Sequence, residues 1–127
     1  MAEWLRERGV GEEELLDVLA RLREAGALDD ERFARMFAED KRELRGWGPD
    51  RIAEALRARG VEQGLIDAAL AAEGHDATRE RAVAALRDGG AEVSDDAGRG
   101  RALSLLARRG FPLELSYDAI RDFERNG

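Results

Sequence analysis

The chain has 127 residues, no cysteine, 39% charged and 43% hydrophobic side chains, and a formal net charge of −7. This length predicts one domain or one short array of repeats, and the lack of cysteine excludes a disulfide framework and thiol chemistry. Charged residues interrupt every apolar stretch, so we expect no signal peptide and no membrane span, and we predict a soluble cytoplasmic protein. Abundant Ala, Leu, Glu and Arg with only two prolines favour an all-α fold.

The first third of the chain predicts three helices, over residues 2–8, 11–25 and 31–45. Gly9 is expected to end the first helix and Gly26 the second. Asp29 and Asp30 are placed to cap the third helix, whose apolar face is formed by Phe33, Met36, Phe37 and Leu44.

The remaining helices are separated by turn residues. The sequence RGWGP at 45–49 breaks the third helix, and Pro49 is placed to open the next one, which is followed by another around 65–70. Asp76 is expected to cap a helix that stops before the Gly89 and Gly90 pair, and residues 89–100 predict a flexible connection. A helix over 101–109 and a last helix opened by Pro112 complete the chain.

One short phrase occurs three times: LRERGV at 5–10, LRARGV at 56–61 and LARRGF at 106–111. Its glycines, Gly9, Gly60 and Gly110, are expected at positive φ, as the left-handed residue of a Schellman helix stop. The pattern predicts tandem three-helix repeats in an elongated, curved array. We place a partial, truncated first repeat at 1–26, a second repeat at 27–74 and a third at 75–127.

Charge alternates along these repeats. Residues 1–40 carry 6 basic and 12 acidic side chains, 41–60 carry 6 and 3, 61–98 carry 3 and 9, and 99–127 carry 6 and 4. Equivalent helices of a regular array line one side, so the two basic blocks predict a basic stripe that meets an acidic partner. The predicted partner-binding residues are Arg45, Trp47, Arg51, Arg57, Arg59, Arg108 and Arg109.

Each of these residues also has a purely structural interpretation. An arginine directly before a helix-ending glycine, such as Arg59 or Arg109, is favoured there by the helix dipole, by about 0.3 to 1 kcal/mol. The other arginines are compatible with an ordinary solvated helix face. Trp47, between two glycines, is suited to filling a gap between helices as well as to anchoring a partner.

The sequence offers no pattern typical of an enzyme. His75 is the single histidine, in a polar junction that suits a turn better than general base chemistry. No glycine-rich phosphate loop, GxSxG or metal-ligand spacing is present. We therefore expect no catalysis, no metal and no cofactor.

Three segments resemble the signature segments of the RecX regulatory proteins: LDDERFA at 28–34, RGWGPDRIAEALRARGV at 45–61 and LARRGF at 106–111. The resemblance covers residues 4–124. It implies tandem three-helix repeats and a cytoplasmic bacterial protein that binds the RecA recombinase along the groove of its nucleoprotein filament. Members of this family usually inhibit ATP hydrolysis, filament extension and strand exchange. This chain differs from the family in lacking the longer arginine-containing helix before Trp4 and in its strong acidity.

The function expected from the sequence is therefore that of a modulator of the RecA filament in recombination, DNA repair and the SOS response. We expect DNA to be contacted only weakly or within the filament complex, with no membrane and no small-molecule substrate. Two alternatives remain open, a small helix-turn-helix DNA-binding protein and a peptide-binding helical solenoid. A net charge of −7 argues against the first, because free-standing DNA-binding proteins carry a dominant basic surface.

Overall fold

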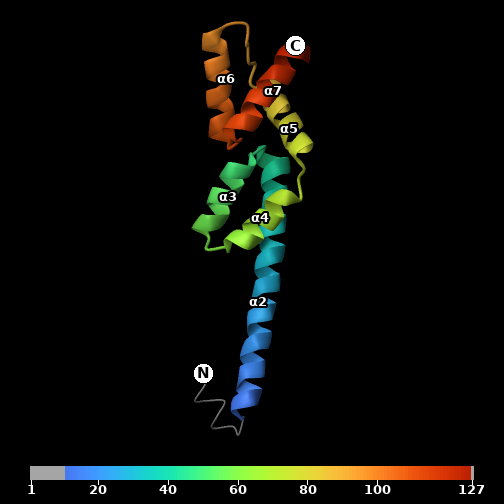
Figure 1. The fold of residues 1–127 in the computed structure, drawn as a ribbon, viewed down its shortest axis with the longest axis vertical. Coiled ribbons are helices and arrows are strands. Elements are labelled where there is room, and N and C mark those ends of the chain that lie inside the picture. Colours follow the sequence, from blue (N-terminus) through green and yellow to red (C-terminus); the bar gives the residue numbers. More distant parts are fainter. Residues whose placement is uncertain (1–10, 127) are drawn as a thin grey trace. The chain divides into compact units, whose positions relative to one another are not determined.

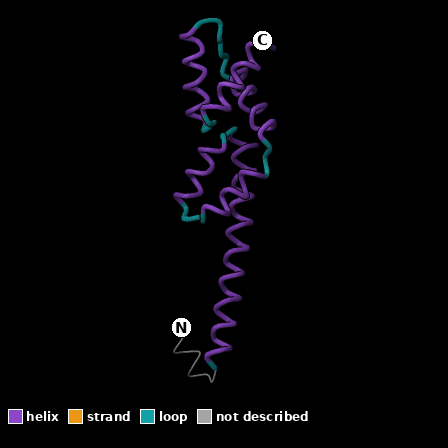
Figure 2. Tube along the Cα trace, in the orientation of Figure 1, coloured by secondary structure: helices purple, strands orange, loops and turns teal. Residues whose placement is uncertain are grey.

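The computed structural model describes residues 11–126, which form six α-helices and one π-helix and contain no strand (Figures 1 and 2). The all-α fold predicted from composition is confirmed. None of the described helices is long and apolar enough to cross a membrane. The helices are α2 (Glu12–Asp40), the π-helix η1 (Lys41–Arg45), α3 (Pro49–Ala58), α4 (Gln63–Ala71), α5 (His75–Asp88), α6 (Asp96–Arg109) and α7 (Leu113–Asn126).

The chain divides into two compact units, Met1–Phe33 and Ala34–Gly127. The first unit contains most of α2, in which Leu15 is buried and Leu22 is exposed. The second unit contains the remaining helices and all the residues predicted to bind a partner. The predicted helix over 2–8, Trp4 and Gly9 lie outside the described residues.

Helix α2 runs without interruption for 29 residues, so the predicted stop at Gly26 and the predicted caps at Asp29 and Asp30 are wrong. Gly26 does not adopt a positive φ. A glycine inside a helix costs about 1 kcal/mol relative to alanine. The strong helix formers on either side of Gly26 offset that cost, and they include Glu24, Ala25, Ala27 and Leu28.

The buried face of the end of α2 is formed by small residues. Ala34 and Ala38 are fully buried, while the predicted face members Phe33, Met36 and Leu44 are exposed. The small side chains of Ala34 and Ala38 allow α3 and α4 to approach α2 closely, so the face of α2 that carries these alanines is the buried one. Only Phe37, which is half-buried against the core, meets the prediction.

Each set of three helices encloses its own core. The end of α2 packs with α3 and α4 around a first core formed by Ala34, Ala38, Ile52, Ala53, Leu56, Val61, Ile66 and Ala69. Helices α5, α6 and α7 enclose a second core, which contains Leu86, Leu106, Phe111, Leu115 and Ile120. These two cores confirm the tandem three-helix plan. The repeat boundaries at residues 26 and 74 stay predictions.

The helix stops predicted from the repeated phrase are confirmed at Gly60 and Gly110, the two of its three glycines that the structure describes. Gly60 has φ +80° and Gly110 φ +93°. The N–H of Val61 donates to the Leu56 carbonyl at 3.1 Å and the N–H of Gly60 to the Arg57 carbonyl at 2.9 Å, which is the Schellman pattern. The same two bonds end α6, at 2.9 Å from Phe111 to Leu106 and 3.0 Å from Gly110 to Ala107.

The predicted helix end before the Gly89 and Gly90 pair is confirmed, and two predicted helix starts are wrong. Gly90, with φ +67°, closes α5, where the Ala91 N–H donates to the Leu86 carbonyl at 2.9 Å. Helix α6 already begins at Asp96, because the Asp95 side chain caps it by accepting from the Gly98 N–H at 2.7 Å. The predicted connection over 89–100 is therefore helical from residue 96 onward. Helix α5 begins at His75 after Gly74, so Asp76 lies in its first turn and is not the cap.

Candidate partner-binding surface

The two three-helix repeats meet through the backbones of two turns. The N–H of Gly48 donates to the Arg109 carbonyl at 2.7 Å, and the N–H of Asp50 donates to the Gly110 carbonyl at 2.9 Å. Free N–H groups at the start of α3 are thereby satisfied by free carbonyls at the end of α6. The positive end of one helix dipole meets the negative end of the other, so the contact is favourable in both respects.

Glycine is required on both sides of this junction. A Cβ on Gly48 would lie 2.6 Å from the Phe111 nitrogen, and one on Gly110 would lie 2.6 Å from the Arg51 nitrogen. Both distances are far inside van der Waals contact. The glycines of the RGWGP turn therefore serve the close approach of the two repeats.

Trp47 is half-buried and lies within a set of aromatic and cationic side chains. Its ring packs edge-on to Phe37 with centroids 6.4 Å apart. The Arg51 guanidinium lies 4.3 Å from its centroid and the Lys41 ammonium 4.9 Å. Such cation–π contacts contribute about 0.5 to 1 kcal/mol each at exposed sites. The ring also packs against the first core, which supports its structural interpretation as a gap filler.

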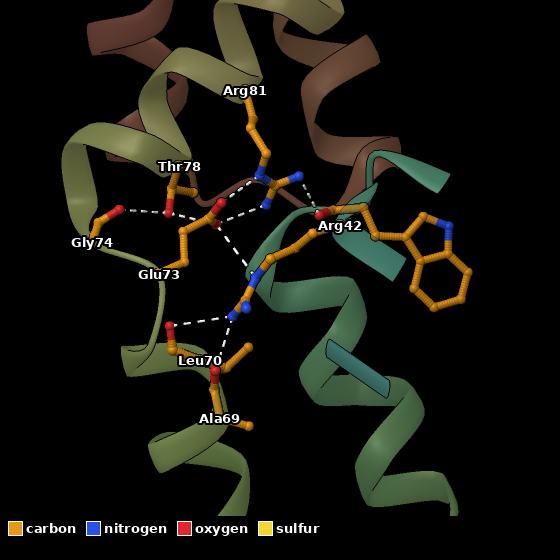
Figure 3. Close-up of polar contacts among 8 residues, drawn as sticks. Arg42, Ala69, Leu70, Glu73, Gly74, Thr78 and Arg81 are labelled. Atoms are coloured by element: carbon orange, nitrogen blue, oxygen red, sulfur yellow. Dashed lines mark hydrogen bonds and ion pairs between the residues drawn. The ribbon is translucent and has the colours of Figure 1, made fainter. Parts of the chain in front are cut away.

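A polar network behind this surface is centred on Glu73, in the link between α4 and α5 (Figure 3). Its carboxylate accepts hydrogen bonds from Arg81 Nε at 2.5 Å, Arg81 Nη2 at 2.8 Å and Thr78 Oγ1 at 2.8 Å. Arg42 Nε forms an ion pair with it at 3.6 Å. The side chain of Glu73 is only 11% exposed, so these partners replace the water that it loses.

The two arginines of the network extend it to three other segments. Arg81 Nη1 donates to the Trp47 carbonyl at 2.9 Å, and its guanidinium lies 5.5 Å from the centroid of the Phe111 ring. Arg42 Nη2 donates to the Ala69 carbonyl at 2.9 Å, near the end of α4. Arg81, from the repeat formed by α5, α6 and α7, therefore holds the Trp47 turn of the preceding repeat.

The pKa of Glu73 is held below its ordinary value. Burial by itself would raise it, because a low-dielectric surrounding disfavours the charged form. The hydrogen bonds from Arg81 and Thr78, together with the charges of Arg81 and Arg42, outweigh burial and lower the pKa. Glu73 is thus a fixed anion at neutral pH.

Three of the predicted arginines are engaged within the chain. Arg51 Nη1 donates to the Arg108 carbonyl at 3.3 Å. Arg57 Nε donates to Gln63 Oε1 at 2.8 Å. Arg59 Nη1 donates to the Ala55 carbonyl at 3.0 Å near the end of α3, as the helix-dipole interpretation predicts.

The other three, Arg45, Arg108 and Arg109, have side chains that make no hydrogen bond or ion pair with any residue in 11–126. Arg45 and Arg108 are exposed and Arg109 is half-buried. The junction thus brings together Trp47, Arg51, Arg108 and Arg109, with Arg45 two residues before Trp47 in the chain. Arg57 and Arg59 lie at the other end of α3, about 9 Å and about 12 Å along the helix axis from Arg51.

Sequence reasoning missed Glu73 and Arg81. Glu73 stands in an acidic block, and Arg81 stands in a helix with ordinary charge spacing. Their partners come from different segments, up to 34 residues away, so no local spacing marks them. The buried acid between two arginines becomes visible only when the segments are assembled.

Residues 11–126 contain no group of three His, Asp or Glu side chains that could hold a metal ion. His75 begins α5 with a side chain that is 61% exposed, and its Nε2 lies 4.0 Å from Asp118 Oδ2. The two side chains thus form an exposed surface contact between α5 and α7.

Comparisons with known proteins agree on one family. Residues 29–70 match the family model described as RecX, second three-helix domain. The chain is 41% identical over 112 residues to "Regulatory protein RecX" of Halorhodospira halophila, covering 87% of this chain and 69% of that protein. It is 33% identical over 123 residues to the protein of the same name from Mycolicibacterium smegmatis, covering 91% and 65%. The chain thus spans about two thirds of the length of these relatives.

A solved structure supports the fold independently. The crystal structure of RecX from Lactobacillus salivarius superposes with a TM-score of 0.69, covering 96% of this chain and 81% of that one. The sequence identity over this match is only 16%, so it demonstrates shared architecture.

Proposed function

Since the chain belongs to the RecX family of regulatory proteins, we propose that it binds a RecA-type recombinase filament and inhibits the filament's ATP hydrolysis and strand exchange. Its place would be the cytoplasm, in recombination and DNA repair. The relatives' names support a regulatory role, and the surface chemistry described above supports the kind of partner.

The observation that carries the proposal is the group of arginines at the junction, Arg45, Arg108 and Arg109. A guanidinium without an internal partner is available for a carboxylate or phosphate of another molecule, which it binds with two parallel hydrogen bonds. These cations stand on a chain of net charge −7. The acidic remainder of the surface repels acidic molecules, whereas the arginines at the junction attract them. This contrast favours one orientation of the bound partner.

The fixed junction between repeats supports an inhibitory role. Backbone hydrogen bonds from Gly48 and Asp50 hold α3 and α6 together, so the arginines keep a constant spacing across the two repeats. A filament presents the same surface at regular intervals. A protein that contacts two neighbouring subunits at a fixed spacing opposes the subunit movements that accompany ATP hydrolysis.

The helix-turn-helix alternative receives little support from the helices that would read DNA. In a pair joined by a glycine turn, the second helix enters the major groove. Helix α4, the second of its pair, contains no basic residue. Helix α7 contains Arg121 and Arg125 but also four acidic residues, Glu114, Asp118, Asp122 and Glu124.

The test is a titration of the purified protein into a RecA ATPase assay on single-stranded DNA. We expect wild-type protein to slow hydrolysis, and the double variant Arg45→Glu, Arg108→Glu to lose at least tenfold in apparent affinity. Arg125→Glu, an exposed arginine at the end of α7, is the matched control and should change it less than twofold. Circular dichroism confirms that each variant is folded.

Two results would contradict the proposal. The first is a wild-type protein that leaves the ATPase unchanged at saturating concentration. The second is tight, sequence-selective binding of the wild type to a free duplex, which would establish the helix-turn-helix alternative.

A further inference from the structure

A groove of about 910 Å³ runs along one face of α6. One wall is the turn and loop that follow α5, part of which is teal in Figure 2. The other wall is the face of α6 that carries Ala97, Arg101, Ser104, Leu105 and Arg108. Arg108 belongs to both the groove and the junction, so the groove continues the candidate surface along the whole of α6.

Two cations mark the length of the groove. Arg101 and Arg108 are exposed and form no hydrogen bond or ion pair with other described residues through their side chains. Seven residues separate them, so they lie on the same side of α6, about 10 Å apart along its axis. Ser104, which is also exposed, stands between them with a free hydroxyl that can donate and accept.

Between the cations the groove combines the Ser104 hydroxyl with apolar side chains and glycines. Leu105, on the α6 wall, and Ala91, on the opposite wall, are half-buried. Gly90 and Gly100 also line it, and no atom lies within 4 Å of a Cβ placed on either of them, so open space remains beside α6 at Gly100. A neighbouring molecule can therefore approach the backbone of α6 closely, as small residues allow at helix contacts.

We propose that this groove docks an acidic amphipathic helix of the recombinase, with two carboxylates spaced two turns apart and an apolar side chain between them. The inference rests on the proposed function and specifies the partner surface. Carboxylates at positions i and i+7 of a helix are about 10 Å apart, which matches the spacing of Arg101 and Arg108. The apolar side chain between them covers Leu105, as in other complexes in which a helix lies in a groove.

A protein segment fits this groove better than a nucleic-acid backbone does. Glu92 is among the residues that line it, and its negative charge disfavours phosphates nearby, whereas a helix can place a basic or polar side chain beside it. Covering the apolar surface of Leu105 and Ala91 with an apolar side chain contributes about 25 cal/mol of binding free energy for each Å² buried. A phosphate makes no such contribution. The whole chain is also acidic, with net charge −7.

The first experiment compares binding to the assembled filament with binding to bare single-stranded DNA, measured by fluorescence anisotropy of the labelled protein. Arg101→Glu lies outside the arginine group on which the proposed function rests. We expect it to bind the filament at least fivefold more weakly than wild type. Arg125→Glu, the control, should bind within twofold of wild type.

The second experiment identifies the molecule in the groove. The chain has no cysteine, so Ser104→Cys places a single photo-crosslinker on the groove face of α6, and Asn126→Cys is the control at the end of α7. Irradiation of the filament complex should join position 104 to recombinase polypeptide, and position 126 should give less than one fifth of that yield.

The possible results are distinguishable. Failure of the wild type to bind the filament overturns both the proposed function and this inference. Normal binding of the wild type together with unchanged binding of Arg101→Glu overturns the groove inference alone. Crosslinking of position 104 to DNA, or an equal loss of bare DNA binding in Arg101→Glu, would show that the groove holds phosphate and would overturn the helix partner.

Discussion

The backbone of Gly48 lies directly against the backbone of Gly110, with no side chain between them. The Gly48 N–H donates to the carbonyl of the neighbouring Arg109 at 2.7 Å. The repeats are therefore joined by main-chain hydrogen bonds, whose geometry varies less than that of contacts between long side chains. The spacing between the arginines on α3 and α6 follows from this contact.

Three glycines, each in a different turn, are required for different reasons. Gly48 has an ordinary φ of −79° but no room for a Cβ. Gly60 has φ +80° and open space around it, and Gly110 combines φ +93° with a blocked Cβ. The left-handed region costs an alanine about 1 to 2 kcal/mol, whereas a backbone collision forces the repeats apart.

We predict from this that Gly48→Ala lowers the free energy of unfolding by about 2 to 4 kcal/mol, through overpacking of the junction and loss of its hydrogen bonds. Gly60→Ala should lower it by only about 1 kcal/mol. Urea denaturation followed by circular dichroism measures both. A loss in Gly48→Ala no larger than that in Gly60→Ala would contradict the predicted backbone collision at the junction.

At Gly26, in contrast, we predict that substitution by alanine raises the free energy of unfolding. It lies inside α2, its φ is not positive, and no atom is within 4 Å of a Cβ placed on it. Gly26→Ala should therefore stabilise the helix by about 0.5 to 1 kcal/mol. Thermal unfolding is the measurement, and a lower melting temperature in the variant would contradict the continuous helix.

The comparison of Gly26 with Gly60 and Gly110 shows what the sequence could and could not predict. All three were expected to end helices. Gly60 and Gly110 are followed by Val61 and Phe111, which have modest helix propensity and are buried against the cores. Gly26 is followed by Ala27 and Leu28, which continue a helix readily. Local signals thus specified the tandem repeat, and the residues after each glycine decided whether the helix stopped.

The candidate surface was less predictable from the sequence. Contacts between distant segments decide which of its arginines have a partner within the chain and which are available to another molecule. Arg51 is held by the Arg108 carbonyl, 57 residues away, while Arg45 has no such partner. Both are arginines in the same basic block, and nothing in their local sequence separates them. Likewise, Glu73 differs from the exposed Glu80 only through the arginines that the fold brings to it.

Arg81 offers a test of the network that joins the repeats. Arg81→Met would leave Glu73 with one weaker cation, and an uncompensated buried charge typically costs about 3 to 5 kcal/mol. Because Arg42 and Thr78 remain, we expect a loss of about 2 to 3 kcal/mol. Arg87→Met, at an exposed arginine of the same helix, should change stability by less than about 0.5 kcal/mol.

The double variant Arg81→Met, Glu73→Gln isolates the interaction itself. If the two side chains stabilise the fold through each other, the combined loss should be smaller than the sum of the single losses by about 1 to 3 kcal/mol. Urea denaturation of the four proteins gives this coupling energy. Additive losses would show that Arg81 acts mainly through the Trp47 carbonyl and the Phe111 ring.

The pH dependence of stability should report the charge of Glu73. Its pKa in the folded protein lies below the ordinary value of 4.5, so the folded state binds this proton less readily than the unfolded state does. The resulting stabilisation is fully present above pH 4.5 and is lost as pH falls through the lowered pKa. Glu73→Gln removes this titration, so its free energy of unfolding should fall less between pH 6 and pH 3 than that of wild type. Glu80→Gln, at an exposed glutamate of α5, should retain the wild-type slope, and an identical slope in all three proteins would show that Glu73 is not held as an anion by its arginines.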